Sequence, residues 1–302
     1  IARRLTAGLG QIMTPLFSPD GKQIAFVGSD EGHPEVYVMN AHGGVSERLT
    51  HFGTLVTRVV GWTPDSSAII CSSSARQPMR RMLELYAVSP KGGSAVPLGY
   101  GNAYHLLYGS PKGFLIGRHT WDIARWKRYK GGTKGDLWID PEGTGTFQRL
   151  LDLNGNLCCP MWIGQRIYFV ADHEGVGNLY SCNLEGQDIQ RHTDHIDYYV
   201  RFPSTDNKTI VYHAGADLFA YDVKTQTSAK IPIDYYSPQV QRYRKFVSPS
   251  QYLTGYELHP DGHSLALTIR GKVFTMGLWE GAVQQYGKPD GVRYRFPGYL
   301  KG

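Results

Sequence analysis

Short runs that alternate apolar and polar residues recur along the whole chain. IAFVG (24–28) and VYVMN (36–40) are examples near the start. Alternation with period two is typical of a β-strand that has one buried face. Four such runs follow one another in each repeat, and six repeats can be traced. An acid or amide, an aliphatic residue and an aromatic residue recur in five of the six third strands, which we predict at 35–40, 83–88, 136–140, 178–183, 217–222 and 272–276.

A turn sequence marks the repeats. It is FSPDG at 17–21, and weaker forms are WTPDS (62–66), GSPKG (109–113), WIGQR (162–166), PSTDN (203–207) and HPDG (259–262). Measured at Phe17, Thr63 and Gly109, the first three turns are 46 residues apart, and the later intervals, to Trp162, Pro203 and His259, are 53, 41 and 56. Proline, aspartate and glycine are the residues that close a tight hairpin. A period of about 40–50 residues predicts a β-propeller.

We therefore predict an all-β fold, a six-bladed β-propeller of four-stranded antiparallel blades. The propeller is expected at 1–288, and residues 289–302 are expected to start a linker to the next domain. Residues 1–6 are interpreted as the last strand of an incomplete blade. Two basic, aromatic stretches, 119–134 and 232–251, interrupt the repeat and are expected to project as loops.

Composition narrows the class of protein. The 302 residues include 36 glycines and 20 tyrosines, as expected for many turns and pleated surfaces. No apolar run approaches the roughly 18 residues of a membrane span. The four cysteines follow no CxxC spacing, which favours reduced thiols in a cytoplasmic protein. A formal charge of +6 permits an acidic partner without requiring one.

Motifs for catalysis or metal binding are missing. No histidine has HExxH spacing and no serine lies in GxSxG. We interpret His173, His192 and His195 as surface residues at strand ends or loops. The segment GGTKG (131–135) lacks the spacing of a phosphate-binding loop. We expect no catalytic residue, no metal ligand and no cofactor in this chain.

Two segments carry a family resemblance. RHTWDIARWKRYKGGTKGDLWID (118–140) and GNLYSCNLEGQDIQRHTDHIDYYVRF (177–202) resemble the N-terminal six-bladed propeller of the tricorn protease family, and the similarity covers essentially all 302 residues. The resemblance implies a large cytoplasmic serine peptidase that assembles as a homo-oligomer, a hexamer in the family. It also implies that the catalytic residues lie outside this chain, which would itself be non-catalytic.

The resemblance also suggests a substrate site. The family's propeller is thought to line a passage to the active site and to hold the C-terminal carboxylate of a peptide with paired arginines. The matching pair here is Arg80–Arg81, in QPMRRM. Two guanidinium groups on one loop can bind a carboxylate through bidentate hydrogen bonds. Read without the resemblance, the same pair is a solvated basic loop.

Basic and aromatic residues also alternate at 125–134, around Trp126 and Tyr129. Such a pattern can bind single-stranded nucleic acid, but we favour an inter-domain contact with Trp126 packed. The predicted function is gating of substrate and product and anchoring of peptide C-termini, within a serine protease that degrades oligopeptides. Its partners would be peptides and the remaining domains of the protease, with no nucleic acid and no membrane. The alternatives are a stand-alone protein-interaction scaffold and a free-standing propeller hydrolase.

Overall fold

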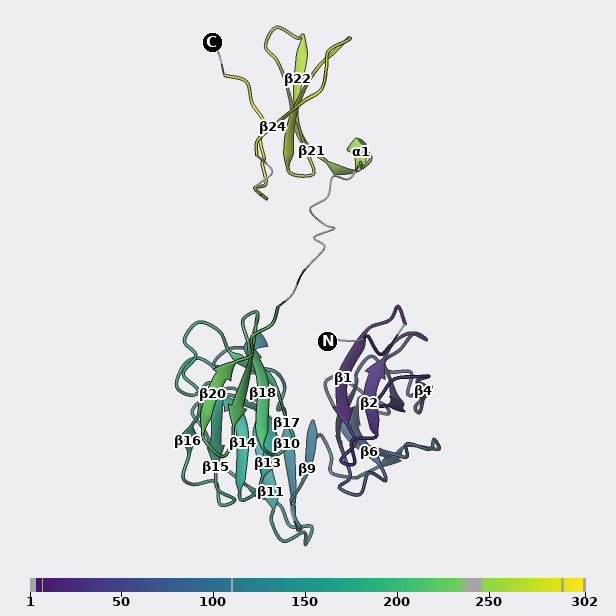
Figure 1. Ribbon diagram of the computed structural model, residues 1–302, viewed down its shortest axis with the longest axis vertical. Coiled ribbons are helices and arrows are strands. Elements are labelled where there is room, and N and C mark those ends of the chain that lie inside the picture. The colour runs from purple at the N-terminus through teal and green to yellow at the C-terminus, as the bar shows by residue number, and fades with distance from the viewer. Residues whose placement is uncertain are drawn as a thin grey trace. The chain divides into compact units, whose positions relative to one another are not determined.

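The computed structural model describes residues 4–6, 8–109, 111–234, 236, 246–288 and 291–300. The chain divides into two compact units, Ile1–Ile233 and Asp234–Gly302, and each is described by itself. Strands dominate both units (Figure 1). In the described residues the helical elements are the short α1 (Pro249–Tyr252) and the 3-10 turn η1 (Ile123–Arg125).

The first unit holds five four-stranded antiparallel sheets, in which the strands are ordered as in the sequence. The sheets are β1 (Ile12–Phe17), β2 (Gln23–Gly28), β3 (Glu35–Asn40) and β4 (Glu47–Arg48); β5 (Thr57–Trp62), β6 (Ile69–Ser73), β7 (Glu84–Val88) and β8 (Val96–Pro97); β9 (His105–Tyr108), β10 (Phe114–Arg118), β11 (Asp136–Asp140) and β12 (Gln148–Arg149); β13 (Leu157–Ile163), β14 (Arg166–Ala171), β15 (Asn178–Cys182) and β16 (Gln190–Arg191); and β17 (Val200–Thr205), β18 (Thr209–Ala214), β19 (Asp217–Asp222) and β20 (Thr227–Lys230).

The second unit holds the sixth sheet, which has the same order. Its strands are β21 (Leu253–Leu258), β22 (Ser264–Ile269), β23 (Lys272–Gly277) and β24 (Gln284–Tyr286). The predicted all-β fold of six four-stranded antiparallel blades is confirmed. Three predicted third strands match the observed bounds, and the other three differ by one residue at one end.

Packing explains the sequence pattern of the third strands. Neighbouring sheets of the first unit pack face to face, so in the first four sheets the second and third strands are largely buried on both faces. In blades one and four, the acid or amide that begins the third strand accepts hydrogen bonds from the loop after the fourth strand. Glu35 accepts hydrogen bonds from the backbone N–H groups of Phe52 (2.9 Å) and Gly53 (2.8 Å), and Asn178 accepts one from His195 (2.9 Å).

The alternation in the sequence predicts fourth strands at 46–50, 95–98, 147–151 and 189–192, but β4, β8, β12 and β16 have only two residues each. In two sheets a threonine hydroxyl replaces the next ladder bond. The Val36 N–H donates to Thr50 (2.9 Å) and the Leu179 N–H donates to Thr193 (2.9 Å). A short edge strand offers few free backbone groups to another chain.

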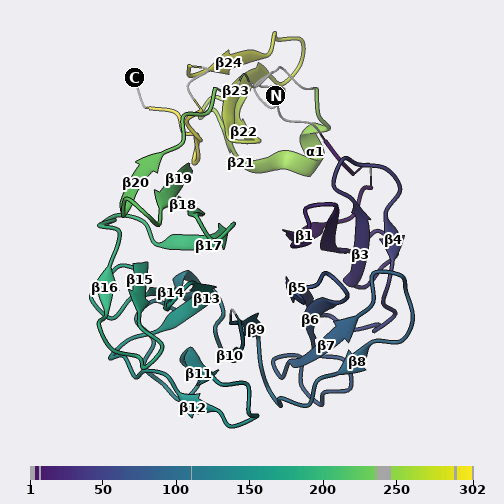
Figure 2. The ribbon, with the colours of Figure 1, turned by 60° about the horizontal axis from the view of Figure 1, so that its bottom comes forward.

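The first strands of the first unit lie on the inner side of its arc of sheets (Figure 2). Along this side β5 contacts β1 and β9, and β13 contacts β9 and β17. Any side chain that reaches across the ends of these strands connects several blades at once.

The segment 119–134 was expected to project as a loop, and for its first part this is wrong. Thr120 and Ile123 are each 1% exposed. Ile123 packs in the core between the fourth and fifth sheets, beside Cys158 and Tyr212. Because Ile123 is a large apolar residue, burial draws the start of the segment into the protein. Only its second part, from Arg125 to Thr133, is largely exposed.

The predictions for the two chain ends can be compared with the structure only where those residues are described. Arg4–Thr6 lies in no strand, contrary to prediction, while residues 1–3 are outside the described part. In the second unit the Tyr294 N–H donates to the Gly271 carbonyl (2.9 Å), so part of the expected linker lies against the sixth sheet. The boundary at 288 stays a prediction. Most of the second expected loop, residues 237–245, is outside the described part.

Candidate functional site

Arg80 and Arg81 lie on the loop between β6 and β7, and both side chains are exposed. The loop itself is held in place. The Met82 N–H donates to the Met79 carbonyl (3.0 Å), and the Tyr104 hydroxyl donates to the Arg81 carbonyl (3.1 Å). No hydrogen bond or ion pair to either guanidinium group occurs within the described residues. The structure therefore presents two adjacent cations, with free donors, on an anchored backbone.

Tyr104 connects this loop to an aromatic and cationic cluster that the sequence analysis did not find. Its ring packs edge-on against Trp121 at 5.7 Å. The guanidinium carbon of Arg58, on β5, lies 3.4 Å from the centre of the Trp121 ring, and that of Arg125 lies 5.5 Å away. These residues are far apart in the sequence, so no local spacing could have revealed the cluster.

Arg58 is half-buried and has no counter-ion within ion-pair distance in the described part of the chain. Burial and the neighbouring positive charge of Arg125 lower its pKa to about 10. Buried charges are normally paired. An arginine without an acidic partner, stacked on a tryptophan, can accept an anionic ligand.

The opposite situation holds at Asp122, which is buried beside the same tryptophan. Its carboxylate forms an ion pair with Arg201 of β17, with one Nε–Oδ2 distance of 3.1 Å. It also accepts the Ala124 N–H (3.2 Å) as the N-cap of η1. Asp122 thus fastens the third blade's segment to the inner strand of the fifth blade, 79 residues away.

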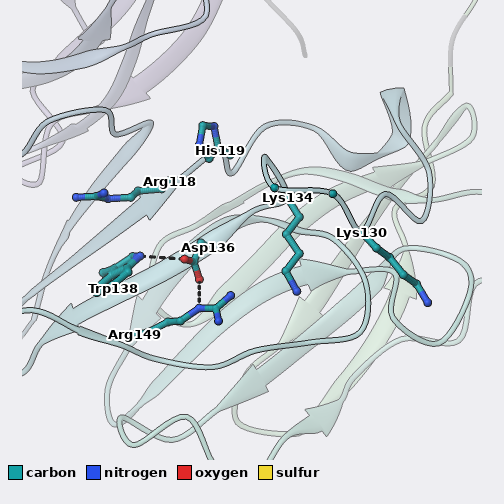
Figure 3. Close-up of a pocket in the computed structure, with 9 residues that line it drawn as sticks. Arg118, His119, Lys130, Lys134, Asp136, Trp138 and Arg149 are labelled. Atoms are coloured by element: carbon teal, nitrogen blue, oxygen red, sulfur yellow. Dashed lines mark hydrogen bonds and ion pairs between the residues drawn. The ribbon is translucent and has the colours of Figure 1, made fainter.

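A second basic region lies at the end of the third sheet where β10 ends and β11 begins (Figure 3). It is a cavity of about 400 Å³, lined by Arg118, His119, Lys130, Gly131, Gly132, Lys134, Asp136, Trp138 and Arg149. Most of its charges are already satisfied. Asp136 accepts hydrogen bonds from Arg149 (2.8 Å) and Trp138 (3.0 Å), and Lys134 pairs with Asp152 (2.6 Å). The cavity is therefore less suited to hold a carboxylate than the free Arg80–Arg81 pair.

A serine–histidine contact occurs in the fourth blade. Ser181 Oγ lies 2.7 Å from Nε2 of His192, and Nδ1 of His192 lies 2.8 Å from the Tyr221 hydroxyl. Ser181 and Tyr221 are fully buried, so a peptide carbonyl cannot reach the serine. Burial, and then the charge of Arg166, lower the pKa of His192 to about 4. The contact joins two blades and does not form a nucleophilic site.

The histidines interpreted as surface residues are partly buried, and that interpretation is wrong. His173 packs on Tyr180 and His195 packs on Phe219. Their partners are strand residues of the same blade or of the next one, so a polar residue at a strand end need not be exposed. The four cysteines are free thiols, and three of them are buried. No helix in the described residues is long and apolar enough to cross a membrane.

Comparison with known proteins identifies a family that matches most of this chain. Residues 1–227 match the family described as the tricorn protease N-terminal beta propeller domain. The chain belongs to the tricorn protease family. It is 37% identical over 296 residues to the tricorn protease homolog of Saccharolobus solfataricus, which covers 97% of this chain and 27% of that protein.

Other relatives agree. The tricorn protease of Thermoplasma acidophilum is 33% identical over 302 residues, covering 97% of this chain and 28% of that one. The crystal structure of the tricorn protease superposes with a TM-score of 0.74 at 32% identity, covering 95% of this chain and 28% of the solved chain. This chain therefore spans about a quarter of the length of these tricorn relatives, and the resemblance seen in the sequence is confirmed.

Proposed function

We propose that this chain is the non-catalytic part of a tricorn-type serine protease that gates oligopeptides and anchors their C-termini. Arg80 and Arg81 bind the terminal carboxylate while residues outside this chain cut the peptide. The observation that carries the proposal is the pair of exposed guanidinium groups, which have no protein acceptor in the described residues and stand on a loop that Tyr104 holds.

The chemistry favours a free carboxylate as the ligand. A planar guanidinium matches a carboxylate with two parallel hydrogen bonds, and two of them can engage both oxygens from different sides. A fixed backbone reduces the conformational entropy that binding would otherwise cost. An amidated peptide end lacks the negative charge and gains nothing from the two arginines.

Gating is supported by the residues around Trp121. Arg58 on β5 and Arg201 on β17 both reach the segment that follows β10, so this segment lies against inner strands of several blades. Passing peptides would meet the Arg58 charge. The remaining domains of the protease are the proposed partners, in a cytoplasmic homo-oligomer that is a hexamer in the family.

One observation favours the alternative, a protein-interaction scaffold. Trp126 is 59% exposed and stacks on Tyr129 at 4.9 Å, which leaves an apolar surface uncovered. The inter-domain contact predicted for Trp126 would cover the same surface. A pure scaffold predicts that peptide cleavage does not depend on Arg80 and Arg81.

The test compares peptides with free and amidated C-termini in the full-length protease. A hydrogen bond to a charged group contributes about 1.5–3 kcal/mol. Arg80→Ala with Arg81→Ala should therefore lower kcat/KM for free-terminus peptides by about 10- to 100-fold. The double variant should cut amidated peptides as fast as the parent protein cuts those same peptides.

Arg76→Ala is the matched control, because Arg76 is an exposed arginine of the same loop. It should leave both peptide sets unaffected. Equal losses on free and amidated peptides would contradict carboxylate anchoring. No loss on either set would favour the scaffold.

A further inference from the structure

The turn between β21 and β22, in the second unit, carries His259, Asp261 and His263 within five residues (Figure 1). Each can offer one ligand atom, and these three atoms lie within 4.8 Å of one another. The two imidazole rings stack with centroids 4.0 Å apart, and Nδ1 of His259 lies 3.6 Å from the Asp261 carboxylate.

Two other blades contain the same turn and serve as an internal comparison. In blades one, two and six the first turn residue accepts an N–H from the residue three positions later, at 2.8, 2.9 and 2.8 Å. The residue that donates has a positive φ in each case, of 70°, 60° and 70°. The backbone frame is therefore the same, and only the side chains differ.

In the other two blades the side chains complete the turn. Ser18 in blade one accepts the Gln23 N–H (3.0 Å), and Thr63 in blade two accepts the Ala68 N–H (2.9 Å). The aspartate then accepts the N–H two residues on, from Lys22 (3.1 Å) or Ser67 (3.0 Å). These bonds are the usual reason for Ser/Thr-Pro-Asp in a turn.

The side-chain hydrogen bonds of these two turns are absent from the described turn of blade six. Histidines occupy the positions of Ser18 and Lys22, and within residues 246–288, all of them described, no backbone N–H donates to the Asp261 carboxylate. Instead the Asp261 N–H donates to Nδ1 of His259 (3.1 Å). That nitrogen therefore carries a lone pair. The same turn closes in blades one and two without a histidine, so its backbone hydrogen bond does not require either one; the ring of His259 also packs edge-on against Tyr299, with centroids 4.7 Å apart.

We propose that His259, Asp261 and His263 bind a divalent transition-metal ion of the zinc type. Two neutral imidazoles and one carboxylate are a ligand set that zinc accepts, with water completing the coordination. Zinc lies about 2.0–2.2 Å from such ligands, so ligand atoms in a tetrahedral site are roughly 3.4 Å apart. The present spacing needs only a small closing movement. The ion replaces the weak N–H contact at His259 if it binds that nitrogen.

This site was missed in the sequence because HExxH spacing assumes a helix. On a helix, ligands at positions i and i+4 share a face. On a tight turn, positions i, i+2 and i+4 converge instead. A search that used the hairpin turn as the frame would have found His-Pro-Asp-Gly-His.

The experiment is a zinc titration by calorimetry at pH 7.5 with the full chain, its metals first removed by a chelator. The parent should bind one ion that is lost in His259→Ser with His263→Lys, which restores the residues of blade one. Loss of outer-shell residues already costs about 10–100-fold in affinity, so loss of both ligands should cost more than about 100-fold. Far-UV circular dichroism checks that the fold is retained.

A transplant tests sufficiency. Thr63→His with Ser67→His places the same pair on the blade-two turn, which already has Asp65 and Pro64. The stoichiometry should rise from one ion to two. The proposal is overturned if the parent binds no zinc, if the blade-six double variant binds zinc as tightly as the parent, or if the transplant adds no ion.

Discussion

Two neighbouring regions of the first unit use arginine in opposite ways. At Asp122 the cation of Arg201 is paired with a buried carboxylate and joins two blades. At the loop between β6 and β7, Arg80 and Arg81 point into solvent and pair with nothing in the described residues. Tyr104 and Trp121 lie between the two regions. The paired arginine joins two blades, whereas Arg80 and Arg81 keep their hydrogen-bond donors free of any acceptor in the described residues.

The largest effect is expected from breaking the buried pair. Asp122→Ala leaves Arg201 without a partner and removes the N-cap of η1. Breaking a buried ion pair typically costs 3–5 kcal/mol, and since the Arg201 side chain is 34% exposed we expect about 2–3 kcal/mol. The free energy of unfolding, measured in denaturant, should fall by this amount.

An exposed ion pair provides the control. Glu142→Ala removes the partner of Lys112, and both of those side chains are more than half exposed. Surface pairs contribute about 0–1 kcal/mol. If Asp122→Ala is no more destabilising than Glu142→Ala, the Asp122–Arg201 pair does not brace the blades.

The second prediction concerns how the stability of the fold depends on pH through His105, which contacts the buried start of the same segment. Nδ1 of His105, on β9, lies 2.7 Å from the Thr120 hydroxyl. Burial, and then the charge of Arg58, lower its pKa from 6.5 to about 4. The unfolded chain therefore binds a proton first as the pH falls. The contribution of neutral His105 to the free energy of unfolding is complete above pH 6.5. It declines as the pH falls from 6.5 to 4 and changes no further below pH 4.

Between pH 7.5 and 5.0 this one histidine should account for about 2 kcal/mol of lost stability. His105→Gln, which cannot be protonated, should reduce the difference in unfolding free energy between those two pH values by that amount. His192 and the other histidines remain in both proteins and cancel in the comparison. An unchanged difference would mean that His105 is not neutral in the folded state.

The fold could be predicted from local signals, whereas the site could not. Turns such as FSPDG and the third-strand pattern act over a few residues, and they located most of the strands. The fourth strands were predicted too long because a hydroxyl, such as that of Thr50, takes over the pairing. Arg80 and Arg81 were identified by family resemblance. Arg58 and Asp122 depend on contacts between blades, and a single sequence does not encode such contacts in its spacing.

The smallest effect is expected at Arg58, which has no acidic partner among the described residues and stacks on Trp121, the residue before Asp122. Arg58→Met keeps the length of the side chain and its contact with Trp121, since a thioether packs well against an aromatic ring. The change loses a cation–π contact of about 0.5–2 kcal/mol, but it also removes a half-buried charge that burial and Arg125 disfavour. These two contributions oppose each other, so the free energy of unfolding should change by less than about 1 kcal/mol.

Arg201→Met is the matched variant. It makes the same chemical change but leaves the buried Asp122 carboxylate with only the long contact to Arg125 (3.9 Å) as an ion pair, so it should be clearly more destabilising. A second readout follows from the charge of Arg58, which helps to lower the pKa of His105. In Arg58→Met the pKa of His105, followed by nuclear magnetic resonance, should move up toward its ordinary value. If Arg58→Met destabilises the protein as much as Arg201→Met does, then Arg58 has a structural partner and is not free to bind an anion.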